Sequence, residues 1–320
     1  MIQTEHLASI LTVFIFLLTI PANQLGIATT NQDNLDNNSN HSGTISGTNL
    51  TSPVVEGSKL NIVASFYPIY EFVKQVGSDK VTVTSLIPVG IEPHDFEPTI
   101  QQIQKTESAD AVLFNGLGFE SSFLDRMSND NLLDTSVGLN ISNIFDPHIW
   151  LDPILAKTQV KNIEEALIKL DPVNKDYYHN NAVNYSRMLD ILDAQIRSTL
   201  QACDKNDFIT SHDAFGHFAD RYGLNQHSIQ GISPDGQILP QKIQEIVELA
   251  RDKGINVIYS EEFVDPRFAE VIAQEIEGAK VLTLSPIEGI KTEEQAAGID
   301  YIDKMSENLA NLKIGLGCQD

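Results

Sequence analysis

The chain has 320 residues, and its 21 Lys and Arg against 44 Asp and Glu give a formal net charge of −23. This length allows about two domains, and 42% hydrophobic with 20% charged residues is typical of a globular protein rather than a disordered one. The acidity argues against a nucleic-acid partner, which needs a basic patch for the phosphates. Two cysteines are too few for a disulfide-dense scaffold or a four-cysteine zinc site.

Residues 1–22 are interpreted as a signal or membrane anchor, because residues 7–22 form one apolar stretch about as long as a signal h-region. Residues 23–58, rich in Asn, Thr, Ser and Gly, predict a disordered polar tether that cannot bury enough apolar surface to fold. Glycosylation sequons in this stretch and at Asn140 and Asn184 weakly support an exterior location. We therefore expect an extracytoplasmic protein, exported or tethered to the membrane by the apolar segment.

From residue 59 onwards, short expected strands alternate with helices, which favours α/β lobes with parallel sheets. The first series places strands at 60–66, 81–88 and 111–114, with helices at 67–76 and from 99. The second places strands at 208–210, 224–231, 256–260 and 281–284, with helices at 214–222, 240–252, 266–276 and 292–316. Between them, apolar residues at three- or four-residue spacing predict one long helix from 171 to about 202.

These elements predict two α/β lobes, residues 59–170 and 204–320, joined by one long helix over residues 171–203.

Three histidines are expected at strand ends or in turn-rich loops: His94, His148 and His212. Ligands of open α/β sheets collect outside the carboxyl ends of the strands, so these imidazoles form a candidate metal site. Acidic residues next to them could orient the imidazoles by accepting the second ring N–H: Asp95, Asp146 and Asp213. By spacing alone, solvated loop histidines remain the alternative, because the three lie more than fifty residues apart.

Three segments carry a family resemblance: Pro-His-Asp-Phe-Glu-Pro at 93–98, Asp-Pro-His-Ile-Trp-Leu-Asp-Pro at 146–153 and Ser-His-Asp-Ala-Phe-Gly at 211–216. Weaker pieces are Tyr-Ser-Glu at 259–261 and Leu-Ser-Pro-Ile-Glu-Gly at 284–289. From about Leu60 to Leu316 the chain resembles the metal-binding (solute-binding) subunit of zinc and manganese ABC transporters. The resemblance implies that the linking helix is rigid and that a metal ion is bound between the two metal-binding lobes.

The resemblance also implies the ligands, which are His94 and His148 from the first lobe and His212 from the second. Many members have an Asp where this chain has Ser285. A zinc-specific branch instead uses the Glu of a Pro-x-Glu-Gly motif, so Glu288 is the expected fourth ligand. Glu261, interpreted as a supporting residue, and water are the alternatives.

The implied function is a high-affinity Zn²⁺-binding protein that captures zinc between two lobes and delivers it to an ABC-transporter permease. Three imidazoles and one carboxylate favour tetrahedral Zn²⁺ over Mn²⁺, which prefers more oxygen ligands. We expect a monomer that is not an enzyme. Other hypotheses are a zinc hydrolase with water as the fourth ligand, a manganese-binding member of the family, and a surface adhesin.

A disulfide between Cys203 and Cys318 is expected, because both residues follow long helices at lobe edges and an exterior location favours oxidation.

Overall fold

The computed structural model describes residues 58–127, 129–234, 236 and 238–319, which all belong to one compact unit. The expected anchor and nearly all of the expected tether therefore lie outside the described residues. No helix in the described ranges is long and apolar enough to cross a membrane.

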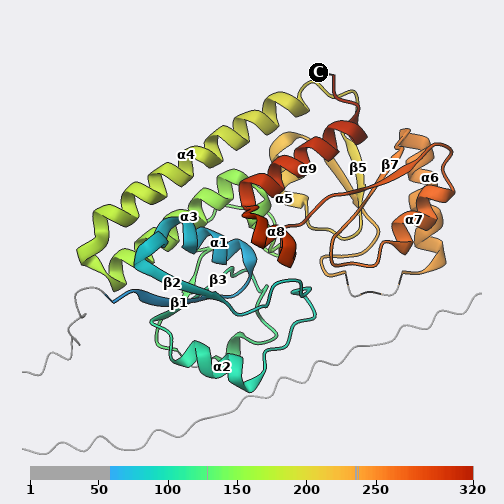
Figure 1. Ribbon diagram of the computed structural model, residues 1–320. Helices are drawn as coiled ribbons and strands as arrows, with labels where there is room; N and C mark the ends of the chain where they lie inside the picture. The colour runs from blue at the N-terminus through green and yellow to red at the C-terminus, as the bar shows by residue number, and fades with distance from the viewer. Residues whose placement is uncertain (1–57, 128, 235, 237, 320) are drawn as a thin grey trace, which may run out of the picture. The chain divides into compact units, whose positions relative to one another are not determined.

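Four parallel strands form the first sheet, in the order β2-β1-β3-β4 (Figure 1). The strands are β1 (Leu60–Ala64), β2 (Val81–Ser85), β3 (Ala111–Phe114) and β4 (Leu132–Asp134). The helices of this part are α1 (Tyr67–Gly77), α2 (Ile100–Glu107) and α3 (Pro153–Leu170), with 3₁₀ turns η1 (Ser78–Lys80), η2 (Leu124–Arg126) and η3 (Ile149–Leu151). Every residue of β3 is buried, as expected for a central parallel strand with both faces covered.

The second sheet repeats this strand order as β6-β5-β7-β8, again all parallel. Its strands are β5 (Asp207–Thr210), β6 (Asn225–Ser228), β7 (Val257–Ser260) and β8 (Lys280–Thr283). Its helices are α5 (Gly216–Tyr222), α6 (Pro240–Lys253), α7 (Arg267–Gln274), α8 (Thr292–Ala297) and α9 (Tyr301–Leu316). The order reverses between β1 and β3 and between β5 and β7, and such reversals are where α/β sheets bind ligands. The prediction of two α/β lobes with parallel sheets is confirmed.

The helix between the two sheets, α4 (Lys175–Leu200), follows a 3₁₀ turn, η4 (Pro172–Asn174). Its buried face holds the residues whose spacing predicted it: Tyr178, Ala182, Tyr185, Leu189, Leu192 and Ile196. It packs on α1 and α3 of the first lobe and on α5 and α9 of the second. At 1.5 Å per residue its 26 residues extend about 39 Å, which is why one helix reaches both lobes (Figure 1).

The prediction of a single helix over residues 292–316 is wrong, because the structure has two helices there, α8 and α9. Gly298 ends α8 with a φ of 80°, a left-handed conformation that glycine adopts without steric cost. Asp300 then caps α9 by accepting from the backbone N–H of Asp303. The expectations also lacked β4 and α3. Strand β4 has only three half-buried residues and so a weak pattern.

The two lobes share one hydrophobic core, which includes Phe72 and Trp150 from the first lobe and Leu284 and Tyr301 from the second. The rings of Phe72 and Tyr301 meet edge to face with centroids 5.1 Å apart. A second cluster lies within the second lobe, on β5, β7, α6 and α7. Beyond α4 and α9, Cys203 and Cys318 are joined as a disulfide in the structure.

Candidate metal centre

Four side chains converge between the lobes, and their candidate ligand atoms all lie within 4.8 Å of one another: His94, His148, His212 and Glu288. Glu288 Oε1 is 3.1 Å from His94 Nε2, 3.1 Å from His148 Nε2 and 3.4 Å from His212 Nε2. Ligands about 2.0–2.1 Å from a tetrahedral zinc ion stand about 3.3 Å apart. The spacing therefore fits a single small ion with four protein ligands.

Each of these residues follows a strand at its carboxyl end. His94 lies in the loop after β2, and His148 comes after β4 and directly precedes η3. His212 follows β5 by two residues, and Glu288 lies in the segment after β8. The parallel sheets thus deliver residues that are up to 194 positions apart in sequence to one point.

Asp146 holds His148 in place. Its Oδ1 accepts from the backbone N–H of His148 at 3.0 Å and from the ring Nδ1–H at 2.8 Å, and both side chains are buried. This contact supports the expectation that the Asp146 carboxylate orients the imidazole of His148. A Cβ atom on Gly216 would stand 2.6 Å from Asp146 Oδ2, so the glycine permits this close approach. His217 Nε2 donates to the Asp146 carbonyl at 3.0 Å.

His212 is oriented by Glu261, which is the residue directly after β7. Glu261 accepts from the backbone N–H of His212 at 3.1 Å and from its Nδ1–H at 2.8 Å. The expectation that Asp213 orients this imidazole is wrong. Strand β7 lies beside β5, so Glu261 comes from the neighbouring strand end, whereas the Asp213 backbone donates toward Gly231.

The two oriented imidazoles present lone pairs to the centre of the cluster. Carboxylates only accept hydrogen bonds, so the neutral rings of His148 and His212 carry their protons on Nδ1 and leave Nε2 as an acceptor. These two Nε2 atoms are 3.3 Å apart, and the Glu288 carboxylate lies against both. A cation at this point would satisfy these acceptors together.

Charge at the centre shifts the pKa values of the side chains in the metal-free protein. Burial lowers the pKa of His212, but the carboxylates of Glu261 and Glu288 raise it by more, so it ends well above 6.5. The pKa of His148 is also raised, since bonding to Asp146 and Glu288 outweighs burial. Burial raises the pKa of Glu288, but the imidazoles outweigh it and hold that pKa well below 4.5. Protons therefore compete with a metal ion for this site.

The backbone before Glu288 is unusual. Ile287 has a φ of 55°, a region that β-branched residues rarely enter. Its N–H donates to the Ser285 hydroxyl at 3.1 Å, and Asn308 makes two hydrogen bonds with the Ser285 backbone. Ser285 therefore stabilises the turn that presents Glu288. Strained conformations of this kind persist where the surrounding structure holds them, often at functional sites.

Three contacts hold the lobes together near the site, two of them buried and one partly buried. The Trp150 indole donates to the Pro286 carbonyl at 2.7 Å, and the Tyr301 hydroxyl donates to the Trp150 carbonyl at 2.6 Å. Arg221 of α5 pairs with Asp152, which caps α3. Trp150 also packs against the His148 ring, with ring centroids 5.2 Å apart.

His217 and Arg221 were not singled out as site residues by the sequence, because neither lies in a matching motif. Their common signal is the spacing of four residues on the short helix α5, which puts both on the face toward the first lobe.

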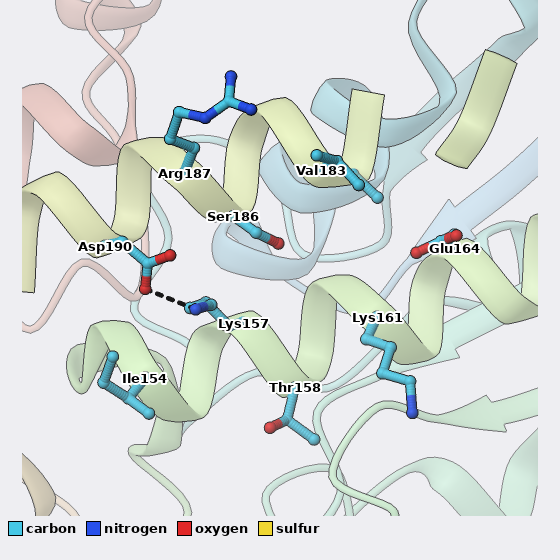
Figure 2. Close-up of a pocket in the computed structure, with 10 residues that line it drawn as sticks. Ile154, Lys157, Thr158, Lys161, Glu164, Val183, Ser186, Arg187 and Asp190 are labelled. Atoms are coloured by element: carbon cyan, nitrogen blue, oxygen red, sulfur yellow. Dashed lines mark hydrogen bonds and ion pairs between the residues drawn. The ribbon is translucent and has the colours of Figure 1, made fainter. Parts of the chain in front are cut away.

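A separate groove of about 580 Å³ lies between α3 and α4 and contains none of the four converging residues (Figure 2). Charged side chains line it, and the figure shows Lys157 of α3 paired with Asp190 of α4 across the groove.

Residues 62–315 match the model of the family described as "Zinc-uptake complex component A periplasmic". The chain is 38% identical over 284 residues to the high-affinity zinc uptake system protein ZnuA of Bacillus subtilis, covering 82% of this chain and 89% of that protein. It is 32% identical to the zinc-binding protein AdcA of Streptococcus pyogenes, of whose length it spans only 57%.

Two solved structures extend the comparison. The Zn(II)-bound ZnuA-like domain of Streptococcus pneumoniae AdcA has a TM-score of 0.72 and 33% identity, covering 81% of this chain and 99% of that domain. The laminin-binding protein Lmb of Streptococcus agalactiae, described as a bifunctional protein with adhesin and metal transporting activity, has a TM-score of 0.75 and 30% identity, covering 81% of this chain and 100% of that one.

Proposed function

We propose that this chain captures Zn²⁺ outside the cytoplasm and delivers it to an ABC-transporter permease. It belongs to the family of periplasmic zinc-uptake complex component A proteins. The observation that carries the proposal is the convergence of three imidazole nitrogens and one carboxylate oxygen at zinc-like spacing. We assign His94, His148, His212 and Glu288 as the ligands, with Asp146 and Glu261 orienting two of the imidazoles.

The position of Glu288 favours a binding protein over a zinc hydrolase. A catalytic zinc site keeps a position open for water and has a general base nearby. Here Glu288 Oε1 stands at the fourth corner, and its side chain is 4% exposed. The carboxylate thus supplies the fourth ligand itself, and the bound ion is cargo rather than a catalyst.

The composition of the ligand set favours zinc over manganese. Three nitrogens and one oxygen suit tetrahedral Zn²⁺, whereas Mn²⁺ prefers more oxygen ligands and a higher coordination number. Ser285, at the position where many relatives have an Asp, is engaged in its own turn, so no second carboxylate comes from that position.

We assign residues 59–170 and 204–320 as the metal-binding lobes and residues 171–203 as their rigid link. Residues 1–22 would direct export or anchor the protein, with residues 23–58 as the tether. The permease is the proposed partner of a monomeric carrier. Adhesion, the second activity in the description of Lmb, is a second candidate.

Metal analysis tests the function directly. The protein is purified without added metal, its metal content is determined by mass spectrometry, and its affinities for Zn²⁺ and Mn²⁺ are compared by competition with chelators. We expect about one zinc per chain and much tighter binding of Zn²⁺, which stands far above Mn²⁺ in the general affinity order. Tighter binding of Mn²⁺ would contradict the assignment.

Ligand variants test the site. His94→Ala and His212→Ala should weaken Zn²⁺ binding by orders of magnitude, and Glu288→Ala should cost less if water fills the vacancy. His179, exposed on α4 and paired with Glu164, provides a matched control, because His179→Ala removes an imidazole that lies outside the cluster. Unchanged affinity in Glu288→Ala would move the fourth ligand to water or Glu261. A peptide-hydrolysis assay tests the enzyme hypothesis, and a binding assay on immobilised laminin tests the adhesin hypothesis.

A further inference from the structure

The loop after β3 (residues 115–120, the β3 loop) contributes no side chain to the cluster of four converging residues. Strand β3 pairs with β4 in a parallel sheet, so the β3 loop opens at the same edge as the segment that carries His148. The strand at the corresponding place in the second sheet is β7, and the residue after it, Glu261, orients His212. The β3 loop therefore stands where a supporting contact to a ligand is expected.

Asn115, the first residue of the β3 loop, holds the peptide bond that leads into His148. The buried Asn115 side chain donates through Nδ2 to the Pro147 carbonyl at 2.9 Å. The N–H of the same peptide bond, which belongs to His148, donates to the Asp146 carboxylate at 3.0 Å. Because a peptide bond is planar, contacts at both its C=O and its N–H fix the orientation of the whole unit.

The Asn115 amide is itself held in one orientation. Its Nδ2 donates to the backbone carbonyls of Pro147 and Gly116, which only accept, so its Oδ1 must face the other way. There the buried Gln159 of α3 donates to Oδ1 through Nε2 at 3.0 Å. Every donor and acceptor of this amide is engaged, and a fully satisfied buried network of this kind is rigid.

Glu120 fixes the conformation of the β3 loop. Its buried carboxylate accepts from the backbone N–H of Asn115 at 2.8 Å and from that of Gly116 at 3.1 Å. The next residue, Leu117, has a φ of 54°, a region that few residues other than glycine enter. Such a conformation persists only where the surrounding structure holds it, and the two hydrogen bonds to Glu120 do so here.

Phe119 brings the β3 loop to a second member of the cluster. Its ring meets the ring of His94 edge to face, with centroids 5.3 Å apart. Phe119 also packs against two buried aromatic rings of the core, with centroids 4.5 Å from Phe66 and 5.4 Å from Trp150. Since His94 lies in a loop rather than in a helix or strand, a ring held by the core limits the rotation of its imidazole.

We propose that the β3 loop positions two of the proposed metal ligands, with Asn115 holding the backbone that leads into His148 and Phe119 holding the ring of His94. The inference rests on the proposed function, because it assigns these two positioning residues to a zinc site. Each acts through the ligand that it contacts. Contacts behind metal ligands fix their orientation, and the loss of such a contact commonly lowers metal affinity about 10- to 100-fold.

Asn115→Ala tests the first contact. It removes the amide that holds the Pro147 carbonyl, and we expect Zn²⁺ affinity, measured by chelator competition, to fall about tenfold. Asn162→Ala is the matched control, because the Asn162 amide also donates to two backbone carbonyls, both within residues 135–137. Neither of these carbonyls belongs to the segment around His148, so the control should bind zinc as tightly as the unmodified protein.

Phe119→Leu tests the second contact. It keeps an apolar side chain but removes the ring that meets His94, and we expect Zn²⁺ affinity to fall about two- to tenfold, the equivalent of one aromatic pair. Phe72→Leu is the matched control, because the buried Phe72 ring also meets other aromatic rings, those of Tyr185 and Tyr301. Neither of these is a proposed ligand, so zinc affinity should be unchanged.

Double variants separate positioning from a general loss of stability. In a His148→Ala background, Asn115→Ala should cause no further loss of zinc affinity, whereas in a His94→Ala background it should cause its full loss. Phe119→Leu should show the opposite dependence on the two backgrounds. In the cobalt-substituted protein, both single variants should shift the visible absorption of the bound Co²⁺, and the two control variants should not.

A crystal structure of the unmodified zinc-loaded protein checks both contacts even if a variant does not fold. It should show the Asn115 amide within hydrogen-bonding distance of the Pro147 carbonyl and the Phe119 ring against the ring of His94. The absence of either contact would overturn the inference.

The affinities can also overturn it. They do so if Asn115→Ala or Phe119→Leu binds zinc as tightly as its control, or if either loses the same affinity in both histidine backgrounds. An unmodified protein that binds no zinc would overturn the proposed function instead, so the two failures are distinguishable.

Discussion

At Gly216, a hydrogen atom is all that the structure accommodates on the side facing Asp146, because an added Cβ would stand 2.6 Å from Asp146 Oδ2. Asp146 fixes the orientation of His148 through its ring and its backbone. We expect Gly216→Ala to displace the carboxylate and to weaken Zn²⁺ binding about tenfold or more, as loss of an orienting partner does.

The matched control for this prediction is Gly231→Ala, because a Cβ at Gly231 meets no atom within 4 Å. Both affinities are measured by chelator competition. If Gly216→Ala binds zinc as tightly as Gly231→Ala does, Asp146 tolerates the displacement and the prediction fails.

The pH dependence of zinc binding follows from the raised pKa values of His148 and His212. The ligands must be neutral imidazoles, and in the metal-free protein these rings hold their protons to a higher pH than free histidine does. As the pH falls through those raised pKa values, apparent affinity should fall about tenfold per pH unit for each proton displaced. Competition measurements from about pH 8 to about pH 5.5 test this; a flat profile would contradict it.

Residue types and loop positions marked the three histidines as candidates, since each follows a parallel strand, but the family resemblance was needed to favour a metal site over solvated loop histidines. Glu261, the partner of His212, was expected as a supporting residue only from the resemblance, and not from the pattern around His212. Glu261 reaches it because β5 and β7 are neighbours, and strand order is not encoded within a few residues of either position.

At the scale of elements, the end of α4 and the end of the chain are joined through Cys203 and Cys318. We predict that this disulfide forms in the exported protein, and that it stabilises the fold by up to about 4–5 kcal/mol in the chain-entropy model for a loop of this size. Replacing both cysteines by serine should lower the thermal midpoint without changing zinc affinity. Two free thiols in the denatured, unreduced protein would contradict the prediction.

The long helix α4 was predicted well, because its buried face matches the spacing residue by residue, whereas the 18-residue helix α3 was not predicted. Boundaries set by single residues were predicted less well. Between α8 and α9 the helical composition continues, and the break depends on the left-handed Gly298 and the cap at Asp300. Helix propensity is summed over many residues, so it does not reveal a break that one or two residues cause.

At the scale of the whole molecule, one core extends through both lobes and includes Trp150 and Tyr301, which are also hydrogen-bonded to each other. We therefore expect a single cooperative unfolding transition in calorimetry rather than one transition for each lobe. Zinc should move this whole transition to higher temperature. When the free zinc concentration is 1,000 times the dissociation constant, zinc binding adds about 4 kcal/mol to the free energy of unfolding. Two separable transitions would show that the lobes unfold independently.

The continuous core also limits how a transporter can distinguish a loaded carrier from an empty one. A large rotation of one lobe against the other would break the packing of Phe72, Trp150 and Tyr301. The angle between the lobes should therefore differ little between the zinc-bound and the zinc-free protein. The most exposed of the four proposed ligands is His94, whose side chain is 10% exposed and lies in a loop rather than in a helix or strand. We therefore expect the transporter to recognise the zinc-loaded protein by the shape and charge of the small surface around that loop.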